Sequence, residues 1–215
     1  MSATQKGNCY LCGAELGKTA MKNHILKNHV AQGGGQECRL LKIEGADNKN
    51  YWLYVCVPVN SSLTVVDTFL RKIWLECCGH MSDIFDLGYA AVKKSTKLGD
   101  IPVGTKLLHE YDFGSTTQCL ITVVDSVTQE GAKRGVRLLA RNIPFEFECG
   151  ECDAKADLID VERMYDGSYP FLCNVCAGKG DNEMVLPVTN SPRMGVCGYC
   201  GELDNFSFVR PQFIK

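Results

Sequence analysis

Apolar positions between residues 64 and 80 recur every three or four residues, in the run TVVDTFLRKIWLECCGH. That spacing places them on one stripe of an α-helix, with charged side chains on the opposite face. Thr64 and Asp67 fit a capping box at the start of this helix, and Gly79 can adopt the left-handed conformation that ends one. The pattern predicts one main helix whose apolar face covers a sheet.

From residue 37 onward, apolar and polar residues alternate with a period of two, the pattern of half-buried strands. Gly114 and Ser115 suit a hairpin turn between two of the predicted strands. Because strands follow one another without alternating helices, the order predicts an α+β fold with a mixed or antiparallel sheet. The predicted strands span residues 38–43, 51–59, 81–87, 106–113, 116–128 and 136–142.

Length and composition indicate a folded core with smaller modules. The chain has 215 residues and is 45% hydrophobic, which is ordinary for a globular protein and excludes wholesale disorder. The run AQGGGQ at residues 31–36 has the composition of a flexible linker. We therefore predict a finger at residues 1–30, a linker at 31–36, an α+β core at 37–148 and a cysteine-rich module at 149–215.

Cysteine usage predicts metal binding. The N-terminus lacks the apolar segment of a signal peptide, and no apolar run approaches the roughly 20 residues that span a membrane, so we expect a cytoplasmic protein. Disulfide frameworks are rare in that reducing compartment. Of the 13 cysteines, eight lie in four CxxC pairs, and the odd total also argues against complete pairing in disulfides.

The first CxxC pair belongs to the pattern C-x2-C-x11-H-x4-H, formed by Cys9, Cys12, His24 and His29. Two thiolates on a knuckle and two histidines about one helical turn apart are typical of a tetrahedral zinc site in a ββα finger. We expect the finger helix at about residues 18–28. The alternative is a redox CxxC beside two unrelated histidines.

The other three CxxC pairs are separated by twenty residues each, a spacing typical of four-thiolate zinc sites. We favour one structural zinc on the first two pairs, which gives two zinc ions in the whole chain. The alternative site uses the second and third pairs. A third ion would require the spare pair to recruit further ligands, such as Cys77, Cys78 or His80. The three pairs are Cys149/Cys152, Cys173/Cys176 and Cys197/Cys200.

Charge distribution suggests where partners bind. Residues 1–36 hold four lysines and one glutamate, whereas residues 149–215 hold six basic and ten acidic groups. Lys18, Lys22 and Lys27 lie on the finger helix, where they could contact DNA or RNA. The alternative is that they are only solvated. The net charge of −2 for the whole chain and the acidic C-terminal part then favour an adaptor for another protein.

No convincing catalytic set occurs in the sequence, so we predict a non-enzymatic protein and identify no small-molecule substrate. Cys77, Cys78 and His80 could form a nucleophile–base pair or half of a metal site. We favour a simpler interpretation, in which the cysteines pack and the histidine meets the negative end of the helix dipole. A thiol-dependent enzyme is the least favoured alternative.

Three segments together resemble the plasmid Orf3-like domain family, whose members are also labelled insertion-sequence passenger proteins. They are WLECCGH at residues 74–80, YDFGS at 111–115 and LPVTNSPRMGVCGY at 186–199. The resemblance covers about residues 37–200, and the finger is similar to those that precede this domain in some members. It implies a compact α+β domain with appended zinc-binding segments and an association with mobile elements, but no established reaction.

Overall fold

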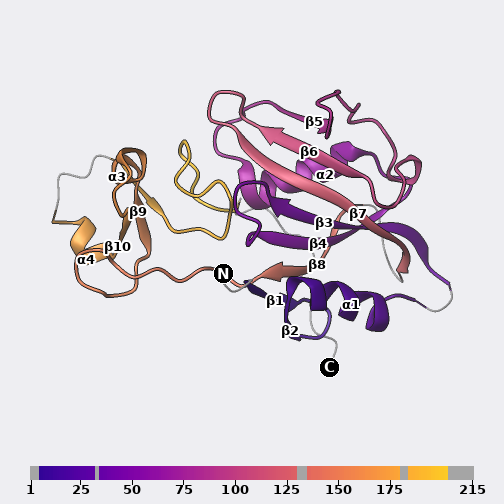
Figure 1. The fold of residues 1–215 in the computed structure, drawn as a ribbon, viewed down its shortest axis with the longest axis horizontal. Coiled ribbons are helices and arrows are strands. Elements are labelled where there is room, and N and C mark those ends of the chain that lie inside the picture. Colours follow the sequence, from indigo (N-terminus) through magenta and orange to yellow (C-terminus); the bar gives the residue numbers. More distant parts are fainter. Residues whose placement is uncertain (1–4, 32–33, 130–134, 180–183, 203–215) are drawn as a thin grey trace.

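The computed structural model describes residues 5–31, 34–129, 135–179 and 184–202. One large antiparallel sheet dominates it, in the spatial order β2-β1-β8-β4-β3-β7-β6-β5 (Figure 1). The predicted core strands are confirmed, each end within two residues of its predicted position. The eight strands are β1 (Lys6–Cys9), β2 (Glu15–Gly17), β3 (Gln36–Gly45), β4 (Trp52–Pro58), β5 (Ser82–Asp86), β6 (Lys106–Tyr111), β7 (Thr117–Gln129) and β8 (Arg137–Asn142).

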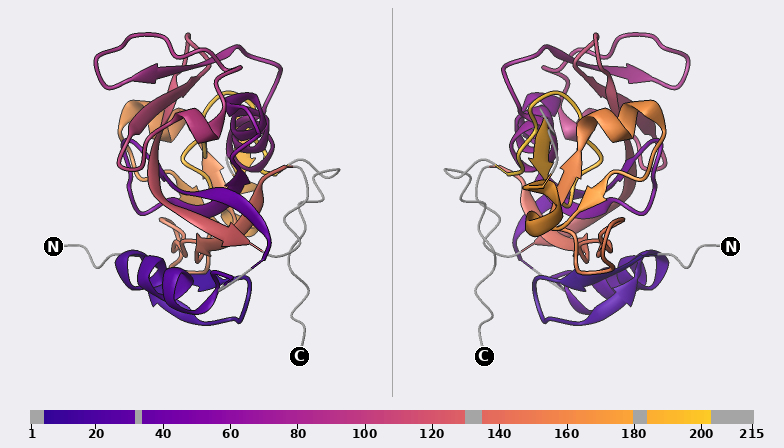
Figure 2. Two further views of the ribbon diagram at one scale, coloured as in Figure 1. Left: turned by 90° about the vertical axis from the view of Figure 1, so that its right-hand side faces the viewer. Right: turned by 90° about the vertical axis from the view of Figure 1, so that its left-hand side faces the viewer.

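Alternate residues along the strands face opposite sides of this sheet. Both faces carry apolar side chains, and a helix covers each of them. On one side, α1 (Lys18–Asn28) buries Met21 and Ile25 in an apolar cluster that also contains Trp52. On the other side, α2 (Leu63–Leu70) packs in a larger cluster that contains Trp74. The end views in Figure 2 show α1 and α2 separated by the strands of the sheet. The protein therefore has an apolar core on each face.

The finger is continuous with the large sheet. Its strand β1 pairs antiparallel with β8, where Gly7 lies opposite Asn142. Close to the predicted linker, the N–H of Ala31 donates to the carbonyl of Thr128 over 2.9 Å, and β3 begins at Gln36. Residues 32 and 33 of that linker lie outside the described residues, as do residues 203–215 of the predicted C-terminal module. The described part of the finger thus shares a sheet and an apolar cluster with the core.

The main helix is shorter than the sequence predicts. After α2 the chain widens into a π-helical turn, η1 (Arg71–Leu75), and Glu76 is already extended. The side chain of Glu76 accepts hydrogen bonds from Arg71, over 2.7 Å, and from the Gly79 N–H, over 2.6 Å. These bonds hold residues 76–79 in a loop, so the predicted helical stretch at 76–78 is wrong, whereas Gly79 has the predicted left-handed conformation, with a φ of 84°.

Asp67 is buried instead of capping the helix, and the predicted capping box is therefore wrong. Its carboxylate is 2.8 Å from Nε2 of the fully buried His109 and accepts a hydrogen bond from Ser82 over 2.6 Å. Lys94 lies 3.3 Å from the same carboxylate. A buried carboxylate requires such partners, because an unpaired charge is costly inside a protein. This polar cluster ties α2 to β5 and β6.

A small three-stranded sheet, in the order β10-β9-β11, lies beside the large sheet at the left of Figure 1. The chain then returns along residues 188–202, which lie between the two sheets in that view. No helix in the described parts of the chain is long and apolar enough to cross a membrane. The remaining elements are the 3-10 turn η2 (Leu98–Asp100), β9 (Leu158–Asp160), α3 (Val161–Asp166), β10 (Phe171–Leu172), α4 (Asn174–Ala177) and β11 (Val185–Pro187).

Candidate metal centres

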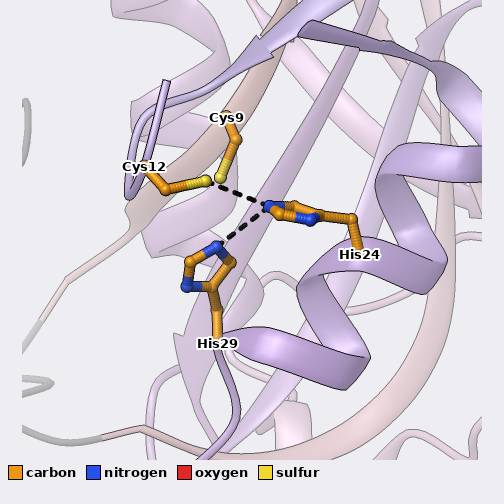
Figure 3. Close-up of side chains that lie close together, drawn as sticks. All are labelled: Cys9, Cys12, His24 and His29. Carbon is orange, nitrogen blue, oxygen red and sulfur yellow. Dashed lines mark hydrogen bonds between the residues drawn. The ribbon is translucent and has the colours of Figure 1, made fainter. Parts of the chain in front are cut away.

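The finger brings its four predicted ligands together (Figure 3). Nε2 of His24 lies 3.1 Å from Sγ of Cys12 and 3.0 Å from Nε2 of His29, and Cys9 completes the group. One donor atom from each residue falls within 4.8 Å of all the others. Two thiols and two imidazoles converging on one point form a donor set that suits tetrahedral zinc.

Local backbone geometry prepares this site. Gly13 adopts a left-handed φ of 79° directly after the second cysteine, and its N–H donates to the carbonyl of Cys9 over 2.8 Å. The knuckle aims both thiols at α1, which starts and ends where the sequence predicts. The side-chain amide of Asn28 lies 3.0 Å from Nδ1 of His24. The same amide nitrogen donates to the carbonyl of His24 over 3.0 Å, so Asn28 lies against the last turn of α1 beside the imidazole.

Cys149, Cys152, Cys173 and Cys176 form a second cluster, the four-thiol set that the sequence favours. Sγ of Cys152 lies 3.7 Å from that of Cys173 and 3.5 Å from that of Cys176. A tetrahedral zinc with bonds of about 2.3 Å holds its thiolates about 3.8 Å apart. The observed separations are close to that value, so the cluster has the size of a zinc site.

A third cluster contains Cys77, Cys78, His80 and Cys197. Sγ of Cys78 lies 3.7 Å from Sγ of Cys77, 3.6 Å from Sγ of Cys197 and 2.9 Å from Nε2 of His80. The alternative four-thiol set is therefore not assembled, because Cys197 joins the residues that follow the main helix. Cys200 is exposed, and its thiol donates to the carbonyl of Gly198 over 3.3 Å.

Two of the cysteines, Cys149 and Cys197, have a pKa below that of an ordinary thiol. Hydrogen bonds from backbone N–H groups, that of Cys173 first, lower the pKa of Cys149 to about 6. A hydrogen bond with His80 lowers the pKa of Cys197 to about 7. Metal ions bind the thiolate form. In the same two clusters, hydrogen bonds with neighbouring cysteines raise the pKa of Cys78 and of Cys176 to about 12, so without a metal each cluster is only partly ionised. All 13 cysteines are free of disulfides, as expected for metal-binding thiols.

The three finger lysines that the sequence selects lie in different environments. Lys18 forms an ion pair with the buried Glu44 and donates to the carbonyl of Lys49 over 2.8 Å. Among the described residues, Lys22 and Lys27 have no carboxylate within ion-pair distance. Lys18 is thus already engaged, whereas Lys22 and Lys27 remain available to a partner.

For Cys77, Cys78 and His80 the sequence favours packing and the helix dipole, with a metal site shared with the spare CxxC pair as the alternative. The structure supports that alternative, because it brings these three residues together with Cys197 of the spare pair. Their ligand partner, Cys197, lies more than a hundred residues further along the chain. The cysteine count gives the signal for this cluster. A four-thiol site leaves one of the three C-terminal CxxC pairs without a partner, and Cys77, Cys78 and His80 form a second incomplete ligand set. Spacing alone could not show that these two groups meet.

Comparisons with known proteins add no functional information. No family model and no curated protein matches the chain. Among solved structures, a protein of unknown function from Methanosarcina mazei Go1 is similar at 13% sequence identity and a TM-score of 0.43, over 56% of this chain and 76% of that one. The resemblance to the plasmid Orf3-like family therefore stays a prediction.

Proposed function

We propose that the protein is a zinc-stabilised, non-enzymatic binding protein that contacts nucleic acid through the outer face of α1. The orientation of this helix carries the proposal. Met21 and Ile25 are fully buried against the sheet, whereas Asn23 and Lys27 are exposed and Lys22 is partly exposed. Ammonium groups suit phosphate oxygens, and an amide suits base edges.

The free lysines limit how strongly such a face can bind. Lys22 and Lys27 can neutralise two phosphates, and each contact contributes about −0.9 to the slope of log K against log salt. Two contacts give a slope of about −1.8, which is about a tenfold loss of affinity between about 50 and about 200 mM salt. A single finger reads only about three base pairs. The helix is therefore one contact within a larger assembly.

Fluorescence anisotropy with labelled duplex DNA and single-stranded RNA tests this proposal. Zinc-loaded wild-type protein should bind weakly at low salt with the slope given above. The double variant Lys22→Ala/Lys27→Ala should lose most of this binding and most of its salt dependence. The matched control, Lys93→Ala/Lys106→Ala, removes the same charge at exposed positions outside the finger and should bind like the wild type. Absence of binding at low salt, or unchanged binding by the first variant, would refute the proposal.

Lys18→Met is a further control, because its ammonium group already serves the fold. It should reduce stability by leaving Glu44 with only Lys42 as a cationic partner. It should leave the salt slope of any nucleic-acid binding unchanged, since the proposed contacts come from Lys22 and Lys27. A salt slope that falls as much in Lys18→Met as in the double variant would contradict this division of roles.

A protein–protein adaptor is the second candidate function. Met81 and Phe113 are 72% and 50% exposed, and the N–H of Asp112 donates to the carbonyl of Met81 over 2.9 Å. Two exposed apolar side chains therefore belong to neighbouring chain segments, an arrangement that suits a protein partner. A partner captured by the wild type but not by Met81→Ser/Phe113→Ser would favour this function. Equal capture by both proteins would count against it.

For either function, we propose a role beside mobile elements, which the resemblance to the plasmid Orf3-like family supports. Nucleic acid cross-linked to the protein in cells should then be enriched in plasmid or insertion-sequence DNA. Recovery in proportion to the rest of the genome would argue against this role. The experiment is independent of the finger variants, because an adaptor could reach such DNA through its partner.

A further inference from the structure

The C-terminal strap, residues 188–202, packs on the end of the main helix. Helix ends leave carbonyl groups without partners inside the helix. Here the hydroxyl of Ser191 donates to the carbonyl of Trp74 over 2.6 Å, and the hydroxyl of Tyr199 donates to that of Ile73 over 3.3 Å. Both strap residues are about 1% exposed. The strap therefore serves as the C-terminal cap of a helix formed more than a hundred residues earlier.

Arg193 anchors the middle of the strap. Its side chain is fully buried and donates to Asp112 over 2.6 Å, to the hydroxyl of Thr117 over 2.9 Å and to the carbonyl of Ser115 over 3.0 Å. The same guanidinium lies 3.4 Å from Sγ of Cys77. A cation at this position offsets negative charge on a thiolate cluster, because three thiolates and one divalent ion leave one net negative charge.

The third cluster joins the strap to the residues that follow the main helix, since Cys197 lies in the strap and its other members are Cys77, Cys78 and His80. The sulfur separations of 3.6 and 3.7 Å around Cys78 match the edge of a zinc tetrahedron, about 3.8 Å. Nε2 of His80 lies 3.6 Å from Sγ of Cys197, so the imidazole faces the sulfur atoms from both chain segments. Three thiolates and one neutral imidazole form a common structural zinc donor set. Packing of unrelated cysteines alone would not require an imidazole nitrogen among them.

We propose that Cys77, Cys78, His80 and Cys197 bind a third zinc ion that fastens the C-terminal strap to the end of the main helix. The site goes beyond the proposed function, since none of its ligands belongs to the finger. Its ligands come from two segments far apart in sequence, so metal binding there stabilises their association directly. Loss of this ion loosens the strap around Cys197, which Ser191, Arg193 and Tyr199 still hold, while the finger site retains its own ligands.

Metal counting on the full-length protein tests the site. Native mass spectrometry and elemental analysis should find three zinc ions in the wild type and two in Cys197→Ser. The matched control is Cys200→Ser, which changes the other cysteine of the same CxxC pair and should retain three. Two ions in the wild type, with no loss in Cys197→Ser, would overturn the proposal. Loss of an ion in Cys200→Ser would also overturn it, since Cys200 would then be a ligand.

A second ligand variant tests the site even if Cys197→Ser does not fold. His80→Asn removes one ligand while keeping every cysteine, and it should also lose one ion. Hydrogen exchange in the strap should accelerate at least about tenfold in Cys197→Ser and in His80→Asn, and remain unchanged in Cys200→Ser. Exchange in α1 should stay at the wild-type rate in all three variants. Retention of the third ion in His80→Asn, or an unchanged strap in both ligand variants, would contradict the assignment.

Discussion

Replacing Gly7 with alanine tests whether the finger and the large sheet fold as one unit. Gly7 lies in β1 opposite Asn142 of β8, where the finger joins the sheet. A Cβ atom at this position would overlap the carbonyl oxygen of Arg141 and the indole ring of Trp52. One of these neighbours is backbone in the sheet and the other is a fully buried ring. Neither can move away without disturbing the core.

A finger that folds by itself and a finger joined to the large sheet predict opposite signs for the change in stability caused by Gly7→Ala. In a finger that folded by itself, the alanine would be favourable by roughly 0.5–1 kcal/mol, because a strand glycine loses more conformational freedom on folding. In the joined arrangement, overpacking costs about 1–3 kcal/mol. For a chain of this length, 1 kcal/mol corresponds to about 2–4 °C in Tm, so Tm should fall by about 2–12 °C.

Thermal unfolding of zinc-saturated protein measures the sign, and hydrogen exchange shows which elements respond. Gly7→Ala should lower Tm and accelerate exchange in both α1 and the strands β4 and β8. The control is Gly17→Ala, where an added Cβ has no atom within 4 Å, and it should change stability by less than about 1 kcal/mol. A higher Tm in Gly7→Ala, or faster exchange confined to α1, would refute the joined arrangement.

Three further predictions follow from buried groups. Asp67→Asn should cost about 1.5–3 kcal/mol by denaturant titration at neutral pH, because an amide replaces the charged acceptor that bonds His109 and Ser82 and pairs with Lys94. Burial raises the pKa of Asp67, but hydrogen bonds, that of His109 first, lower it overall from 3.8. Its stabilising contribution is therefore present above pH 3.8 and lost in stronger acid. There the unfolding curves of the wild type and of Asp67→Asn should converge. Arg193→Leu should destabilise by about 3–5 kcal/mol, measured in the same way, because it leaves the buried carboxylate of Asp112 without its cation. Cys149→Ser should remove one zinc by native mass spectrometry and accelerate hydrogen exchange in the small sheet but not in α2.

Local patterns in the sequence predict most of the fold. The alternation of apolar and polar residues locates the core strands, because side chains on a strand alternate between the two faces of the sheet. The spacing of Cys9, Cys12, His24 and His29 locates the finger cluster, and the spacing of the next two CxxC pairs locates the second. In each case the ligands come in pairs close in sequence, so the spacing between them carries the information.

Contacts between distant segments account for what the sequence does not predict. The helix ends early because Glu76 bonds to Arg71 and Gly79, and because the freed loop carries Cys77 and Cys78 into the third cluster. Residue spacing alone gives no signal for these bonds. The burial of Asp67 is a similar case, since its position near the helix start fits a cap equally well. Only the approach of β5 and β6 makes it a buried anion.

The three clusters occupy places with unequal support from apolar packing, and this inequality would determine how much a metal ion bound at each cluster contributes to stability. The finger cluster adjoins an apolar core with Met21, Ile25 and Trp52, so α1 keeps favourable contacts with the sheet when its metal is absent. The cluster on the small sheet has less support. The buried apolar group beside its ligands comprises Cys149, Leu172 and Cys173, two of which are ligands themselves, and the small sheet adds the buried side chains of Ile159 and Val161. A structure with so little buried surface depends on its metal for stability. Progressive chelation should therefore release the small sheet before the finger, even though both sites have four ligands.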